Sequence, residues 1–159
     1  RYEQLLPMYL KKKEGKIMPS VREVLLKIRA EGSLSLLLTG NSRTGAEYKM
    51  RHFGLETFFD FDRSAFCEDS AVRDDVASRA GDFVKTLPPR AGRRVFVIGD
   101  TPNDIRCGKD IGALTIAVAT GSFTEKELEP HDPWWLVSKI PDAESFWNYL
   151  YGNEGIETA

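Results

Sequence analysis

The chain has 159 residues, of which 42% are hydrophobic and 29% charged, and its formal net charge is -2. This composition is typical of one globular domain and excludes a disordered or fibrous protein. The charge balance lacks the basic surplus that a nucleic-acid partner requires, and no apolar run approaches the length of about eighteen residues that predicts a membrane span. Cys67 and Cys107 lack the spacing of a zinc site or a disulfide framework, which favours a reducing, cytoplasmic location.

Helical and extended patterns alternate along the chain. Apolar residues at helical spacing predict helices, and short continuous apolar runs predict strands that are covered on both faces. The second predicted helix has Ser20 as its candidate N-cap. The predicted helices cover residues 2–14, 21 to about 31, 43–53, 73–86, 104–112 and 142–151, and the predicted strands cover 34–38, 95–98, 114–118 and, more weakly, 134–137. This alternation predicts an α/β fold with a Rossmann-like, doubly wound, mainly parallel sheet.

The residues that follow each strand form the candidate site, because ligands in such sheets bind at the carboxyl ends of the strands. Thr39, Gly40 and Asn41 come directly after the first strand and precede a helix. A hydroxyl, backbone N–H groups exposed by glycine and the positive end of a helix dipole suit a bound oxyanion. A simple N-cap in a tight turn is the alternative interpretation.

Two carboxylates, Asp100 and Asp104, follow the 95–98 strand. They suit Mg²⁺, which takes one or two carboxylates together with waters and a substrate phosphate. The alternative is that Asp100 makes a turn and Asp104 caps the helix. A carboxylate at the end of a buried strand needs a cation or several donors, which favours the metal. Residues 119–122, after the next strand, are typical of an ordinary turn that borders the same crevice.

These strand ends resemble motifs of the haloacid-dehalogenase (HAD) superfamily, and more narrowly of its phosphoglycolate-phosphatase-like members. Residues 97–113, which contain Gly99-Asp100-Thr101-Pro102-Asn103-Asp104-Ile105, resemble the fourth motif, and residues 37–41 resemble the second, whose Ser or Thr holds phosphate. The third motif is a Lys or Arg that neutralises the phosphate. We assign it to Arg73 rather than Lys85, which lies too close to the fourth motif, and a surface ion pair is the alternative role of Arg73.

The first motif of the family, D-x-D-G-T, has no counterpart in the chain. Its first Asp is the nucleophile and its second the acid/base. Asp60-Phe61-Asp62 lacks the Gly-Thr continuation and follows the second motif, so we interpret Asp60 and Asp62 as loop residues. In the family the missing strand lies between the strands that end at Thr39 and Asp100, so its absence would leave two apolar edges unpaired. The resemblance thus predicts that residues 1–14 end a helical cap, and that residues 15–159 form a core whose missing segment is supplied in cis or by a separate chain.

The resemblance implies a Mg²⁺-dependent phosphohydrolase that acts on a small phosphorylated metabolite through an aspartyl-phosphate, with no activity of this chain alone. The alternatives are a noncatalytic HAD-like protein that binds a phosphorylated ligand, and a haloacid dehalogenase. A nucleotide-binding Rossmann domain is disfavoured, because neither glycine-rich nucleotide motif follows a strand. The implied catalytic residues are Thr39, Arg73 and Asp100, the implied substrate-binding residues are Thr39, Gly40, Asn41 and Arg73, and the implied metal ligands are Asp100 and Asp104.

Overall fold

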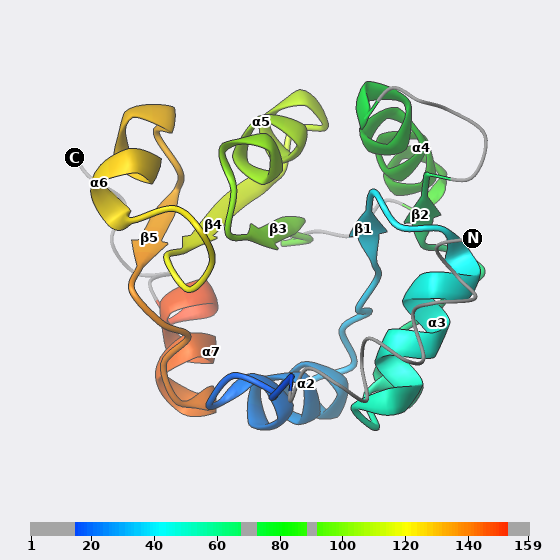
Figure 1. Ribbon diagram of the computed structural model, residues 1–159, viewed down its shortest axis with the longest axis horizontal. Helices are drawn as coiled ribbons and strands as arrows, with labels where there is room; N and C mark the ends of the chain where they lie inside the picture. The colour runs from blue at the N-terminus through cyan, green and yellow to red at the C-terminus, as the bar shows by residue number, and fades with distance from the viewer. Residues whose placement is uncertain (1–14, 68–72, 89–91, 153–159) are drawn as a thin grey trace. The chain divides into compact units, whose positions relative to one another are not determined.

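A computed structural model of the chain describes residues 15–67, 73–88 and 92–152. The chain divides into two compact units: unit 1 comprises Arg1–Glu68 and Ile140–Ala159, and unit 2 comprises Asp69–Lys139. Each unit contains its own parallel sheet (Figure 1). Among the described residues, no helix combines the length and the apolar character needed to cross a membrane.

Unit 1 is built around a short parallel strand pair. Strand β1 (Leu38–Thr39) pairs with β2 (Ala65–Phe66), and Leu38 lies opposite Ala65. The helical segments are α2 (Val21–Ala30), α3 (Arg43–His52), the 3-10 helix η1 (Glu56–Phe58) and α7 (Ala143–Tyr151). Helices α2 and α7 contact each other (Figure 1). Their apolar sides are buried at Val24, Phe146 and Leu150, and the four-residue spacing of the last two places both on one face of α7.

Unit 2 is a three-stranded parallel sheet with helices between its strands. The strand order is β3-β4-β5, with β3 at Phe96–Gly99, β4 at Leu114–Val118 and β5 at Trp135–Val137. The helical segments are α4 (Arg73–Thr86), α5 (Pro102–Asp110), α6 (Glu125–Leu128) and the 3-10 helix η2 (Glu129–His131). Parallel neighbours need such crossovers, because a tight turn cannot join two strands that run in the same direction.

Helix α5 packs closely against the sheet of unit 2, and this packing fixes where its N-terminus lies. A Cβ atom at Gly108 would collide with the Thr115 methyl group on β4 and would press against Val97 on β3. The glycine thus allows the helix backbone to approach both strands. Ile105 of α5 is buried in a core cluster with Ala117 and Leu128. The first turn of α5 is consequently held beside the carboxyl end of β3.

The predicted α/β class with parallel strands is confirmed, and the prediction that the strands are covered on both faces is right for β4 but wrong for the runs 34–38 and 95–98. Strand β1 has only two residues, and Leu34, which precedes it, is 48% exposed. Ile98 in β3 is 42% exposed. Among the described strands, β1 pairs only with β2 and β3 pairs only with β4, so each has an open edge.

Other predictions differ from the structure at the ends of elements. Ser20 stands at the N-cap position of α2, but its φ angle is 67° and its side chain makes no capping bond, so the predicted cap is wrong. The elements β2, η1, α6 and η2 are too short to show a periodic pattern and were not predicted. The helix predicted over residues 2–14, and with it the end of a cap, lies outside the described residues.

Candidate active site

The end of β1 carries the predicted phosphate-binding residues in a compact hydrogen-bonded turn. The Thr39 hydroxyl oxygen accepts hydrogen bonds from the backbone N–H of Asn41, at 3.1 Å, and from the Asn41 side-chain amide, at 2.8 Å. The Asn41 amide oxygen in turn accepts a hydrogen bond from the Lys49 ammonium group, at 3.0 Å. These three side chains are partly buried. Thr39 is therefore held in one orientation by its neighbours in sequence and by a lysine on α3.

The sequence left open that this turn only caps the following helix. In the structure that N-cap is Ser42, not Thr39. The Ser42 hydroxyl oxygen accepts a hydrogen bond from the backbone N–H of Gly45 and so caps α3. The Thr39 hydroxyl is thus not needed as the helix cap. Gly40 is exposed between the strand and the helix. A ligand at this turn would meet the N-terminus of a ten-residue helix, where backbone N–H groups favour an anion.

The end of β3 carries the two predicted metal ligands, and they make different contacts. The Asp104 Oδ2 atom accepts hydrogen bonds from the backbone N–H groups of Asp100 and Thr101 and from the Thr101 hydroxyl. The Thr101 oxygen also accepts a bond from the backbone N–H of Asp104, which completes a capping box with Pro102 in the first turn. One oxygen of Asp104 therefore stabilises the start of α5.

The Asp100 carboxylate is half-buried beside this cap. Among the residues that the structure describes, none donates a hydrogen bond to its two oxygens. The backbone of Gly121, which follows β4, closes one side of the carboxylate so tightly that a Cβ atom at Gly121 would collide with Asp100 Oδ2. Similarly, a Cβ atom at Gly99 would collide with the Asp104 side chain. Two glycines thus leave the space that the two carboxylates occupy.

These residues fit a magnesium ion of the kind that relies on few protein ligands. Within the described part of the chain, no group of three or more His, Cys, Asp or Glu side chains is arranged as a metal site. Mg²⁺ does not need such a group, since it commonly keeps several waters and uses one or two carboxylates together with substrate phosphate oxygens. The Asp100 oxygens are not used by hydrogen bonds from described residues and are therefore available to an ion. Asp100 is thus suited to bind the ion directly, whereas Asp104 already uses one oxygen in the cap.

The predicted third-motif residue, Arg73, is the first residue of α4, and its side chain lies outside what the structure describes. Its role stays a prediction. Lys85, in the last turn of the same helix, forms an exposed ion pair with Asp82, at 3.0 Å.

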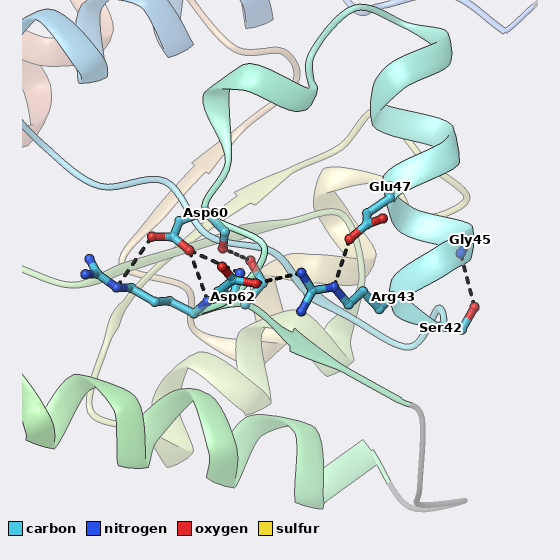
Figure 2. A network of polar contacts seen from close by, with 8 residues as sticks. Ser42, Arg43, Gly45, Glu47, Asp60 and Asp62 are labelled. Atoms are coloured by element: carbon cyan, nitrogen blue, oxygen red, sulfur yellow. Dashed lines mark hydrogen bonds and ion pairs between the residues drawn. The ribbon is translucent and has the colours of Figure 1, made fainter.

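Asp60 and Asp62 are loop residues, as interpreted from the sequence, and Figure 2 shows the network that they form. The Asp60 Oδ1 atom accepts hydrogen bonds from the backbone N–H groups of Asp62 and Arg63, which close the turn before β2. The Asp62 carboxylate pairs with the Arg43 guanidinium group at 2.7 Å, and Arg43 also pairs with Glu47. Asp62 and Glu47 together raise the pKa of Arg43. Both aspartates thus shape a turn.

Unit 1 also contains an open cavity of about 790 Å³ around this loop. Its walls come from the end of α2, residues 33–35, one side of α3, η1 and residues 59–62. One wall residue, Glu56, has a buried carboxylate oxygen, Oε2, without a hydrogen-bond partner in the described structure. Thr39, Gly40 and Asn41 are not part of these walls. The cavity is therefore separate from the residues that we predict to bind phosphate.

The two halves of the candidate site belong to different units. Thr39, Gly40 and Asn41 lie in unit 1, and Asp100 and Asp104 lie in unit 2. Their juxtaposition stays a prediction. Two contacts were not predicted from the sequence, that of Lys49 with Asn41 and that of Gly121 with Asp100, because they depend on how a helix and a neighbouring strand are placed. Gly121 itself lies in the segment 119–122, which was expected to border the crevice. The eight-residue separation of Lys49 from Asn41 is close to two helical turns, which is the one hint that the sequence contains.

The sequence of one part of the chain is similar to that of a known protein family. Residues 71–143 match the HAD-hydrolase-like family. This match covers nearly the whole of unit 2 and includes Asp100 and Asp104. No curated protein matches the chain. In sequence, the chain is thus HAD-hydrolase-like over the segment that carries the predicted metal ligands.

Solved structures give similarity in fold over most of the chain. A candidate phosphatase from Clostridium difficile superimposes with a TM-score of 0.71 at 24% identity, over 91% of this chain and 66% of that protein. A haloacid dehalogenase-like hydrolase from Streptococcus pneumoniae gives 0.70 at 19% identity, over 92% and 67%. A protein predicted to be a phosphoglycolate phosphatase, from Haemophilus somnus, gives 0.64 at 18% identity, over 91% and 61%. The chain therefore has a HAD-like fold, and it spans about two thirds of the length of these proteins.

Proposed function

We propose that this chain is the core of a Mg²⁺-dependent phosphohydrolase that acts on a small phosphorylated metabolite in the cytoplasm, with a nucleophilic aspartate outside the chain. The observation that carries the proposal is the Asp100 carboxylate. It follows β3 directly, is half-buried, receives no hydrogen bond from a described residue, and lies within the segment that matches the HAD-hydrolase-like family. A carboxylate in that environment is suited to a hard cation.

The residues of the chain would divide the electrostatic work of the reaction. Asp100 would hold Mg²⁺ directly, and Asp104 would keep the loop in place through its cap and act on the ion through water. The bound ion would neutralise charge on the phosphoryl oxygens. Thr39 and the backbone at Gly40 would donate hydrogen bonds to those oxygens, and Arg73 would add a positive charge. Phosphoryl transfer depends mostly on such positioning and charge stabilisation.

The covalent chemistry would be supplied by a segment that this chain lacks. A carboxylate oxygen of its first Asp would form a bond to phosphorus as the bond to the leaving oxygen breaks, and the second Asp would give a proton to that oxygen. The same second Asp would then take a proton from water as the water attacks the aspartyl-phosphate. The products would be the free alcohol and inorganic phosphate, with both aspartates regenerated.

The proposal is tested by Asp100→Asn in the complete protein, with p-nitrophenyl phosphate as substrate. The change keeps the size of the side chain and removes its charge, so we expect kcat/KM to fall by about a hundredfold to a thousandfold or more, because several kcal/mol of transition-state stabilisation is lost. Removal of divalent ions with EDTA should abolish the activity, and added Mg²⁺ should restore it.

The matched control is Asp82→Asn, which makes the same chemical change at an exposed ion pair on α4. It should leave kcat/KM within about twofold of the unmodified protein, since exposed ion pairs contribute little. Near-normal turnover by Asp100→Asn, or full activity in EDTA, would contradict the proposal. Activity on a halogenated acid without a metal would instead favour a dehalogenase, and phosphate binding without turnover would favour a noncatalytic protein.

A further inference from the structure

A chain of hydrogen bonds leads from Lys49 to Thr39. The Lys49 ammonium group donates to Asn41 Oδ1 at 3.0 Å, and Asn41 Nδ2 donates to the Thr39 hydroxyl oxygen at 2.8 Å. The backbone N–H of Asn41 donates to the same hydroxyl oxygen at 3.1 Å. Lys49 lies on α3, which begins immediately after this turn. All three side chains belong to unit 1, so their contacts are described within one compact body.

Lys49 determines which way the Asn41 amide faces. An amide side chain presents an acceptor on one side and a donor on the other, and the two orientations have nearly the same shape. An ammonium group has three donors and no acceptor. The atom of Asn41 that faces Lys49 must therefore be the oxygen, and the atom that faces Thr39 must be the nitrogen.

This orientation determines what Thr39 can still do. A hydroxyl group has two acceptor positions and one donor. Asn41 occupies both acceptor positions, one with its backbone N–H and one with its side chain. The Thr39 hydroxyl group can therefore make one further hydrogen bond, in which its O–H donates. A phosphoryl oxygen only accepts hydrogen bonds, so a hydroxyl that is restricted to donation suits such a ligand.

We propose that Lys49 is a positioning residue for phosphate recognition, which acts through Asn41 to fix Thr39 as a hydrogen-bond donor. The inference deepens the proposed function and rests on it. Without Lys49, the Asn41 amide is able to turn over and present its oxygen to Thr39. The hydroxyl would then donate to Asn41, and its hydrogen would be lost to the phosphate.

The first test compares two replacements of Lys49 in the complete protein. Lys49→Met keeps a long, helix-compatible side chain without a donor, and Lys49→Gln keeps a neutral donor that reaches toward Asn41. We expect Lys49→Met to lower kcat/KM for p-nitrophenyl phosphate by about tenfold and to weaken inhibition by inorganic phosphate by a similar factor. Lys49→Gln should recover most of both losses. Lys126→Met, at an exposed lysine of α6, is the control for loss of a positive charge and should change neither quantity.

The second test asks whether Lys49 acts through Thr39. Thr39→Val removes the hydroxyl group while keeping the branched shape. If the inference is correct, Lys49→Met should have almost no further effect in the Thr39→Val background. An equal loss in both backgrounds would overturn the inference, as would unchanged kinetics in Lys49→Met or a failure of Lys49→Gln to recover activity.

A third measurement does not depend on activity. The side-chain amide resonances of Asn41 should shift in the NMR spectra of both Lys49→Met and Thr39→Val and should stay near their original position in Lys49→Gln. Unchanged Asn41 resonances in Lys49→Met would overturn the inference by themselves. A protein without phosphatase activity but with these shifts would contradict the proposed function while leaving the hydrogen-bond assignment correct.

Discussion

Gly121 leaves space for the Asp100 carboxylate because it has no side chain. Its backbone lies so close to the Asp100 carboxylate that a methyl group would collide with it. We expect Gly121→Ala to lower the free energy of unfolding by about 1–2 kcal/mol, because an overpacked site forces its neighbours to move. In an Asp100→Ala background the same change should be neutral or stabilising, since alanine restricts the unfolded chain.

Urea denaturation of the four proteins in this cycle measures the coupling between the two positions. An equal cost of Gly121→Ala in both backgrounds would show that the methyl group meets something other than the Asp100 side chain. Activity gives an independent check, because a displaced Asp100 carboxylate should raise the Mg²⁺ concentration that half-activates the complete protein.

Residues of the candidate site could be predicted from the sequence where they directly follow a strand, because the end of the strand then determines where they lie in the fold. Thr39 ends β1 and Asp100 follows β3, so both were found by reading what comes after each apolar run. Gly121 lies in the segment 119–122 that follows the next apolar run, but its contact with Asp100 could not be predicted, and Lys49 could not be found in that way. The reach of Lys49 depends on the direction in which α3 leaves the turn, and the contact of Gly121 depends on the register between β3 and β4.

At the scale of elements, Thr115 connects two neighbouring strands. It is 2% exposed on β4, and its hydroxyl oxygen accepts a hydrogen bond from the backbone N–H of Trp134, just before β5, at 3.2 Å. Thr115→Val keeps the shape and leaves that N–H group without its acceptor, so we expect a loss of about 1–3 kcal/mol of unfolding free energy. Hydrogen exchange at the Trp134 amide should become faster.

Thr115→Ser is the matched control for this prediction. It retains the hydroxyl acceptor and removes the methyl group that faces Gly108, so its cost should be about 1 kcal/mol from lost apolar burial. The Trp134 amide should stay protected in this variant. Equal exchange rates at Trp134 in the two variants would show that the hydroxyl does not hold the start of β5.

Elements with a strong periodic pattern could be predicted closely, and short elements could not. Helix α4 and strand β4 have the predicted bounds, because α4 repeats its apolar residues at helical spacing and β4 is a short, mostly apolar run. Strand β1 (Leu38–Thr39) shares only Leu38 with the predicted strand 34–38, since a strand needs a partner and β2 provides one for Leu38 and Thr39 only. Ser20 has the residue type of an N-cap but not its backbone conformation, which residue type alone does not determine.

At the scale of the whole molecule, similarity in fold extends over much more of the chain than similarity in sequence. The family match spans residues 71–143, close to unit 2, whereas the solved structures superimpose on about nine tenths of the chain. Unit 2 carries the predicted metal ligands, which the chemistry constrains to few residue types. Unit 1 carries the predicted phosphate-binding turn, which relies on backbone N–H groups and one hydroxyl group.

Magnesium should stabilise the folded chain if Asp100 binds it. A ligand that binds only the folded state adds RT ln(1 + [L]/Kd), which is about 2.7 kcal/mol at a concentration one hundred times the dissociation constant. We expect Mg²⁺ to raise the Tm of the unmodified chain and of Asp82→Asn, and to leave the Tm of Asp100→Asn unchanged. A control titration with Na⁺ at equal ionic strength separates binding from charge screening. If Asp100→Asn were stabilised by Mg²⁺ as much as the unmodified chain, the ion would have to bind elsewhere, and the carboxylate beside Gly121 would be left without its proposed role.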